Sequence, residues 1–157
     1  MKALAEKLGA RLKARGAMLV TAESCTGGWV AEAVTAIGGS SEWFERGFVT
    51  YSNAAKVEML GVSAETLARH GAVSEETARE MAAGALNNSR GSVALAITGV
   101  AGPGGGTPEK PVGTVWIGLD DGEGVARHFR LIGDRDEIRR RSVQAALELL
   151  RHRLRGK

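Results

Sequence analysis

The sequence contains few residues of the kinds that crosslink chains, bind metals or stack on bases. Of its 157 residues one is Cys, three are His and 4% are aromatic. A single cysteine excludes an internal disulfide and a multi-cysteine zinc site, and a free thiol is typical of a reducing compartment. No two of the histidines have a spacing that would place them on one helix face, so we expect neither a metal nor a His-based triad. These histidines are His70, His128 and His152.

Long apolar runs are also absent. No stretch approaches the roughly 20 apolar residues that cross a bilayer. Residues 1–7 are charged and typical of a helix rather than of a signal peptide. With 43% hydrophobic and 25% charged residues, the composition is that of a globular protein. We therefore expect a single cytoplasmic domain over 1–157, without membrane contact.

Charge of neither sign dominates, since the formal net charge is +3, but arginines gather toward the C-terminus. A nucleic-acid interface is one interpretation of that basic stretch. A solvated helix face is favoured, because acidic residues such as Asp134, Asp136 and Glu148 are interspersed and no aromatic residues are available to stack bases. We therefore do not expect a nucleic-acid partner.

Alternating apolar segments and polar turns predict an α/β chain. Apolar residues at helical spacing indicate helices over 2–15, 27–37 and 135–155, and Ser52, Ser63 and Ser74 are each placed to begin another. Runs typical of strands cover 17–22, 47–51, 92–98, 112–119 and 125–131, with the last two joined as a hairpin. The pattern predicts a mixed sheet of about five strands with helices on both faces.

The stretch 21–29, Thr-Ala-Glu-Ser-Cys-Thr-Gly-Gly-Trp, concentrates reactive groups where a strand passes into a helix. Free N–H groups at a helix start favour an anion, and Gly27 and Gly28 would let a ligand approach closely. An ordinary capped turn, with Thr26 as the N-cap, fits the same residues. Cys25 is a candidate nucleophile, but it ranks below serine because no base for it is identifiable.

A glycine-rich loop, 99–106, follows the apolar strand 92–98. It is not a dinucleotide fingerprint, because a strand rather than a helix follows it, and it lacks the Gly-Lys-Ser/Thr ending of a P-loop. Two interpretations stay open. The loop is either a flexible connection or a ligand-facing segment that presents Thr98 at a strand tip.

Ser41, Tyr51 and Lys56 are the parts of a possible serine–lysine site. A neutral lysine can activate a serine when burial or a helix start lowers the pKa of its amine. By spacing alone the plainer interpretation is favoured, in which Ser41 is a cap, Tyr51 a packing aromatic and Lys56 a solvated side chain.

Seven short motifs, in order across nearly the whole chain, resemble the CinA C-terminal domain family. Each is weak alone, but their common order is specific. The resemblance is closest to the stand-alone nicotinamide-nucleotide amidohydrolases of that family. The motifs lie at 22–28, 39–41 with Phe44, 50–53 with Lys56, 70–74, 98–103 with 105–106, 110–115 and 133–135.

The resemblance implies a three-layer α/β/α sandwich, a homo-oligomer expected to be a dimer, and neither cofactor nor metal. It implies hydrolysis of nicotinamide mononucleotide (NMN) to nicotinate mononucleotide and ammonia, within NAD recycling. The implied mechanism uses Lys56 as the base and Ser41 as the nucleophile, with Tyr51 assisting proton transfer. Ser24 and then Ser40 are the alternative nucleophiles.

The substrate-binding residues expected from the same motifs are Ser24, Thr26, Gly27, Gly28, Thr98, Gly99, Gly102, Arg135 and Arg139. The turn 26–28 is expected to hold the 5′-phosphate, and Arg135 or Arg139 to add a bidentate contact to it. Backbone N–H groups near Ser41 or in 98–102 are expected to stabilise the oxyanion. The alternative function is a non-catalytic nucleotide-binding or regulatory module associated with competence or DNA damage.

Overall fold

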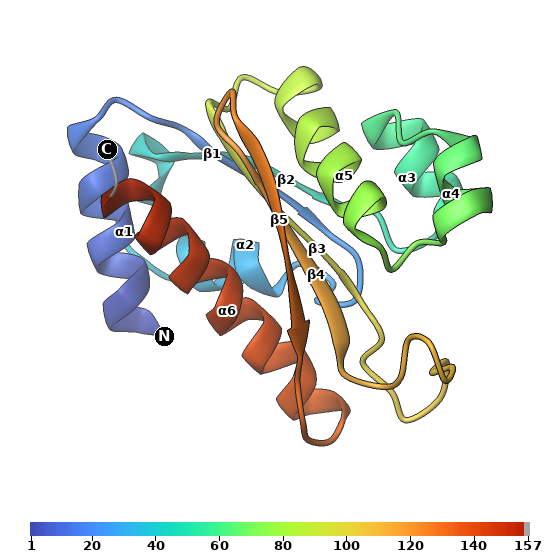
Figure 1. Ribbon diagram of the computed structural model, residues 1–157. Coiled ribbons are helices and arrows are strands. Elements are labelled where there is room, and N and C mark those ends of the chain that lie inside the picture. The colour runs from blue at the N-terminus through green and yellow to red at the C-terminus, as the bar shows by residue number, and fades with distance from the viewer. Residues whose placement is uncertain (156–157) are drawn as a thin grey trace.

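Five strands form one mixed sheet with helices on both faces, so the predicted three-layer α/β/α sandwich is confirmed (Figure 1). The computed structural model describes residues 1–155, and the last two residues of the domain predicted over 1–157 lie outside the described residues. The strand order is β2-β1-β3-β4-β5. The strands are β1 (Leu19–Glu23), β2 (Phe44–Val49), β3 (Val93–Gly99), β4 (Thr114–Asp120) and β5 (Gly124–Arg130).

The direction of the strands changes halfway across the sheet. Strand β1 runs parallel to β2 and to β3, whereas β3–β4 and β4–β5 are antiparallel pairs. The carboxyl ends of the three parallel strands therefore meet at one edge of the sheet, where α/β proteins commonly bind ligands.

Three helices cover each face of the sheet. Helices α1 (Lys2–Ala14), α2 (Trp29–Thr35) and α6 (Arg135–Arg155) lie on one side (Figure 1). On the other side, α5 (Glu75–Asn87) packs on the strands with α3 (Asn53–Leu60) and α4 (Ala64–His70) beside it. A single 3₁₀ turn, η1 (Ser40–Glu42), precedes β2.

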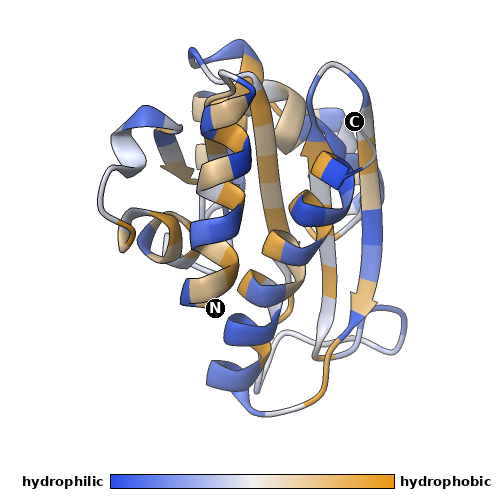
Figure 2. Ribbon diagram, turned by 90° about the vertical axis from the view of Figure 1, so that its left-hand side faces the viewer, coloured by the Kyte–Doolittle hydropathy of each residue, from blue (hydrophilic) through white to orange (hydrophobic). Residues whose placement is uncertain are grey.

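The core is divided between the two faces by the alternation of strand residues. In β3, Leu95 and Ile97 pack toward α1 and α6, while Ala94 and Ala96 pack toward α5. Helices α1 and α6 lie side by side and are banded with hydrophilic and hydrophobic residues (Figure 2). The face toward α5 is built from small residues, and a Cβ on Gly118 would lie 2.5 Å from the Ala78 carbonyl oxygen, so α5 lies unusually close to the sheet.

The predicted helix starts after Ser52, Ser63 and Ser74 are confirmed, since each hydroxyl accepts hydrogen bonds from the first turn of its helix. The strand predicted over 47–51 instead covers Phe44–Val49. It is an edge strand with little burial, so its residues carry a weak hydrophobic pattern. Thr50 and Tyr51 consequently belong to the connection that leads into α3.

The alternative in which Thr26 is the N-cap of the helix is not what the structure shows. Helix α2 begins after Gly28, which has φ 104°, and its first N–H groups are bonded by Glu23 of β1. The two Glu23 carboxylate oxygens accept from Val30 N at 2.9 Å and from Ala31 N at 3.1 Å, and one of them accepts from the Thr26 hydroxyl at 2.6 Å. A buried side chain from the strand therefore caps the helix, which the local sequence of the turn did not reveal.

The contact between α3 and α5 depends on Gly84. A Cβ placed on Gly84 would lie 1.9 Å from the Leu60 carbonyl oxygen, at the end of α3. Gly84→Ala should lower the melting temperature by several degrees, although alanine favours a helix interior by about 1 kcal/mol, because α3 has to move away from α5. Thermal denaturation followed by circular dichroism measures the change.

Gly38→Ala is the matched control, since a Cβ there would meet nothing within 4 Å. A Gly84→Ala protein as stable as the control would show that α3 does not need this close approach.

Candidate active site

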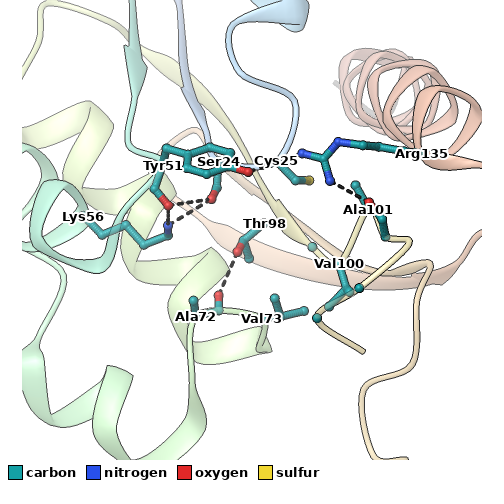
Figure 3. Close-up of a pocket in the computed structure, with 14 residues that line it drawn as sticks. Ser24, Cys25, Tyr51, Lys56, Ala72, Val73, Thr98, Val100, Ala101 and Arg135 are labelled. Atoms are coloured by element: carbon teal, nitrogen blue, oxygen red, sulfur yellow. Dashed lines mark hydrogen bonds between the residues drawn. The ribbon is translucent and has the colours of Figure 1, made fainter. Parts of the chain in front are cut away.

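A cavity of about 300 Å³ opens at the carboxyl ends of β1 and β3 (Figure 3). Separate segments of the chain line it. Ser24 and Cys25 come from the turn after β1, Tyr51 from the connection into α3, Lys56 from α3 itself, and Arg135 from the start of α6. The turn at 72–73 and the loop that follows β3 complete the wall.

Lys56 lies in the first turn of α3 and is 1% exposed. Its Nζ lies 3.0 Å from the Ser24 Oγ, 2.8 Å from the Thr50 carbonyl oxygen and 3.1 Å from the Tyr51 carbonyl oxygen. Among the described residues no carboxylate forms an ion pair with it. Burial disfavours the charged amine, so the pKa of Lys56 is lowered from its ordinary value of 10.5.

Lys56 Nζ donates to three oxygens, and one of them is the Ser24 hydroxyl oxygen, which in turn lies 3.5 Å from the Tyr51 carbonyl oxygen to which it donates. A neutral amine has two N–H donors, which the Thr50 and Tyr51 carbonyl oxygens can accept. Its lone pair is then left for the third partner, the Ser24 Oγ at 3.0 Å. In that protonation state the Ser24 hydroxyl donates to the lysine, which is the arrangement of a nucleophile and its general base.

Ser24 is held in place by the sheet. It directly follows β1, and its backbone N–H donates to the Ile97 carbonyl oxygen of β3 at 3.0 Å. The side chain is 8% exposed and points into the cavity toward Lys56 (Figure 3). The sequence predicts Ser24 as a substrate-binding residue and as the second-ranked nucleophile, after Ser41. In the structure, Ser24 makes the contact with Lys56 that was expected of Ser41.

The structure does not bring Ser41 to Lys56. Ser41 is exposed in η1, before β2 begins, while Lys56 lies beyond the end of that strand. Six strand residues separate the two ends, a distance of roughly 20 Å. Ser40 lies in the same turn, and neither serine lines the cavity. The structure therefore does not bring together the Ser41–Lys56 pair that the family resemblance implied, because the intervening segment is extended rather than folded back.

Tyr51 approaches Lys56 through its carbonyl oxygen and not through its phenol. The side chain is 63% exposed, and its hydroxyl oxygen accepts from Arg135 Nη2 at 3.3 Å. Arg135 also donates from Nη1 to the Gly102 carbonyl oxygen at 2.7 Å. Together, Tyr51, Arg135 and Gly102 join three separate segments at the mouth of the cavity.

The turn 26–28 differs from the anion cradle that was expected. The first N–H groups of α2 already bond the Glu23 carboxylate, which also places a negative charge there. Arg139 donates to the Cys25 and Thr26 carbonyl oxygens at 3.0 and 3.4 Å and lies 5.3 Å over the Trp29 ring. The turn is therefore stabilised from within the protein, and Thr26, Gly27, Gly28 and Arg139 lie outside the cavity lining.

Thr98, Gly99 and Gly102 line the cavity, in agreement with their predicted positions. The Thr98 hydroxyl, however, donates to the Ala72 carbonyl oxygen at 2.8 Å, so it fixes the turn before α5 (Figure 3). Ala72 and Val73 were not among the predicted site residues, and the motif at 70–74 was the one signal for them.

Cys25 is the second nucleophilic side chain of the cavity. Its burial raises the pKa of the thiol from 9.0 to about 11, so the thiolate is scarce near neutral pH. Cys25 is therefore a weaker candidate nucleophile than its neighbour Ser24.

Residues 1–155 include no group of three or more His, Cys, Asp or Glu side chains that could hold a metal ion. Among the same residues, no helix has both the length and the apolar character required to span a bilayer.

Known proteins resemble this chain over almost its full length. The model of the CinA C-terminal domain matches residues 1–154. The chain is 58% identical over 149 residues to the nicotinamide-nucleotide amidohydrolase PncC of Escherichia coli strain K12, which covers 94% of this chain and 90% of that protein. It is 51% identical over 146 residues to PncC of Pseudomonas putida, covering 92% and 91% of the two chains.

Solved structures show the same similarity. A competence-damaged protein (CinA) superfamily protein from Klebsiella pneumoniae superposes with a TM-score of 0.96 at 39% identity, covering 99% of this chain and 98% of that chain. A competence/damage inducible protein from Agrobacterium tumefaciens gives a TM-score of 0.94 at 49% identity, with 96% and 93% covered. Sequence and structure thus agree that the chain belongs to the CinA C-terminal domain family.

Proposed function

We propose that the protein is an amidohydrolase that converts NMN and water to nicotinate mononucleotide and ammonia. Relatives at 51–58% identity are named nicotinamide-nucleotide amidohydrolases, and they match this chain over nine-tenths of its length or more. The observation that carries the proposal is the 3.0 Å contact between the Lys56 Nζ and the Ser24 Oγ inside the cavity.

Ser24 is the proposed nucleophile and Lys56 the general base. Neutral Lys56 takes the Ser24 hydroxyl proton while Oγ attacks the carboxamide carbon, which gives a tetrahedral intermediate. The intermediate collapses to an ester on Ser24, and the Lys56 ammonium returns the proton to the departing ammonia. Water then attacks the ester with Lys56 again as the base, which releases the carboxylate and restores the serine hydroxyl.

Arg135 is the proposed contact for the nucleotide phosphate. It is the one of the two predicted arginines that lines the cavity, and its guanidinium lies at the mouth. Arg139 is engaged by the backbone of the turn after β1. A guanidinium suits a phosphate because its N–H groups form paired hydrogen bonds with two oxygens.

A non-catalytic nucleotide-binding module is the second candidate, and the environment of Lys56 argues against it. Burying an amine without a carboxylate partner disfavours its charged form and costs stability. A binding module would gain nothing from a neutral amine directed at a serine, whereas a hydrolase requires one.

We also propose that the protein acts in the cytoplasm as a homodimer. The one cysteine is free and buried, which suits a reducing compartment. The family resemblance supports the dimer. Light scattering on the purified protein would measure the mass of the particle directly.

Replacing the two candidate serines separates the two assignments. Ser24→Ala should lower kcat for ammonia release from NMN by about a thousandfold or more, because the nucleophile is lost. Ser41→Ala is the matched control and should retain the parental rate, since Ser41 is exposed and outside the cavity. Ammonia release by a coupled assay measures both, and the opposite ranking would return the reaction to Ser41.

The pH dependence of the rate tests the base. Because the pKa of Lys56 is lowered below 10.5, kcat/KM should rise with pH as the amine loses its proton and should level off before pH 10.5. Lys56→Arg should be inactive across this range, because a guanidinium keeps its proton. A rate that falls with rising pH would require a protonated Lys56 and would contradict its role as base.

Lys56→Met should also change how stability depends on pH. In the parent, the unfolded chain binds a proton at Lys56 up to pH 10.5 while the folded chain has already released it, so stability rises with pH between the folded and unfolded pKa values. The variant should lose this rise. Urea denaturation at several pH values measures it, and an unchanged pH dependence would show that the pKa of Lys56 is not lowered by folding.

A further inference from the structure

A second cavity, of about 400 Å³, lies on the α5 side of the sheet, beyond the turn at 71–74 from the active-site cavity. The pairing of β3, β4 and β5 shows how the two cavities lie relative to each other. Thr98 of β3 pairs with Trp116 of β4, which pairs with His128 of β5. Thr98 lines the active-site cavity, whereas Trp116 and His128 line the second one, and Val73 lines both. The second cavity therefore borders the active site but is separate from it.

The second cavity has an aromatic floor. The rings of Trp116 and His128 are stacked, with centroids 4.9 Å apart and planes inclined by 27°. Trp116 faces the α5 side of the sheet yet is only partly buried, because α5 packs tightly over Gly118, further along the strand, and begins beside the tryptophan. A partly exposed indole in a cavity is a suitable surface for a flat or cationic group.

Acidic side chains surround this floor. Glu75 and Glu76 lie in the first turn of α5, and Glu109 lies in the loop before β4. Arg79 pairs with Glu75 at 3.0 Å. Lys110, the lysine of the rim, donates to the His70 carbonyl oxygen. Glu76 Oε1 lies 3.7 Å from His70 Nδ1. The three carboxylates Glu75, Glu76 and Glu109 outnumber the cations Arg79 and Lys110 by one, so the cavity favours a positive ligand.

The lining offers no free serine hydroxyl like that of Ser24. Ser74 is the one serine of the lining, and its hydroxyl donates to the Gly71 carbonyl oxygen at 3.0 Å and accepts from Thr77 N at 3.1 Å. Its oxygen is thus engaged in capping α5.

We propose that the second cavity is a binding site for a small organic cation with a flat ring or an N-alkylated head. The cation lies over Trp116, where its attraction to the indole face adds to the charge of the carboxylates. Glu76 and Glu109 supply the counter-charge. This site is independent of the proposed hydrolysis, since it uses neither Ser24 nor Lys56.

Calorimetric titration with 1-methylpyridinium, a flat cation without a carboxamide, tests the site. Binding is expected to the parent chain and to Ser24→Ala alike. The double variant Glu76→Gln/Glu109→Gln should bind about tenfold more weakly, which is the size expected for the loss of two partly exposed charge contacts. Benzyl alcohol, a neutral molecule of similar size, should bind more weakly than the cation to the parent.

Glu6→Gln/Glu148→Gln is the control for net charge, because it removes two carboxylates from α1 and α6 on the opposite face of the sheet. It should bind 1-methylpyridinium as the parent does. The proposal is overturned if the parent does not bind the cation, if both double variants bind it equally, or if benzyl alcohol binds as tightly. Each of these results leaves the ammonia-release assay unaffected.

Discussion

The buried amine of Lys56 is the constraint on which the site depends. Removing an ammonium ion from water costs several kcal/mol unless a carboxylate or several polar groups compensate. Two backbone carbonyls and a serine hydroxyl surround this amine, and its burial lowers the pKa from the ordinary value of a lysine. The fold therefore makes this amine easier to deprotonate than an exposed lysine, and it does so without a histidine.

The position of that amine is set by how α3 is held. Ser52 caps the helix, and the connection at 50–51 leaves β2 so that both of its carbonyls turn toward Nζ. The far end of α3 rests on Gly84 of α5. The lysine is therefore fixed by backbone geometry at both ends of a short helix, which suits a group that has to keep its contact with Ser24 through a catalytic cycle.

Glu23 holds Ser24 in position, as the ends of α3 hold Lys56. Its buried carboxylate bonds the start of α2 and the Thr26 hydroxyl, so the turn that begins at Ser24 is held without a bound anion. Arg139 holds the same turn from α6. Nucleophile and base are thus supported separately, from opposite faces of the sheet.

The elements of the fold could be predicted from the sequence because their signals are local. Apolar periodicity, the capping serines and the glycine stops predicted all six helices and five strands, with the ends of β2 shifted. The choice among serines is not a local property. Ser24 and Lys56 are 32 residues apart and meet only because β1 and β2 are parallel neighbours, whereas Ser41, closer in sequence, lies at the other end of β2.

The side chain that caps α2 could not be predicted from the sequence, for a related reason. Thr26 has the residue type of a cap at a suitable position, but Glu23 reaches the same N–H groups from the strand and carries a full charge. The residue type at one position does not show whether a side chain elsewhere in the sequence reaches the same N–H groups in the folded protein.

The most direct measurement of the central claim is the titration of the lysine amines by ¹⁵N nuclear magnetic resonance. One Nζ signal, assigned to Lys56 by its absence in Lys56→Met, should titrate below 10.5 and should shift in Ser24→Ala. If the Lys56 signal titrates with the exposed lysines and does not respond to Ser24→Ala, the amine is an ordinary charged side chain and the account of the site is contradicted.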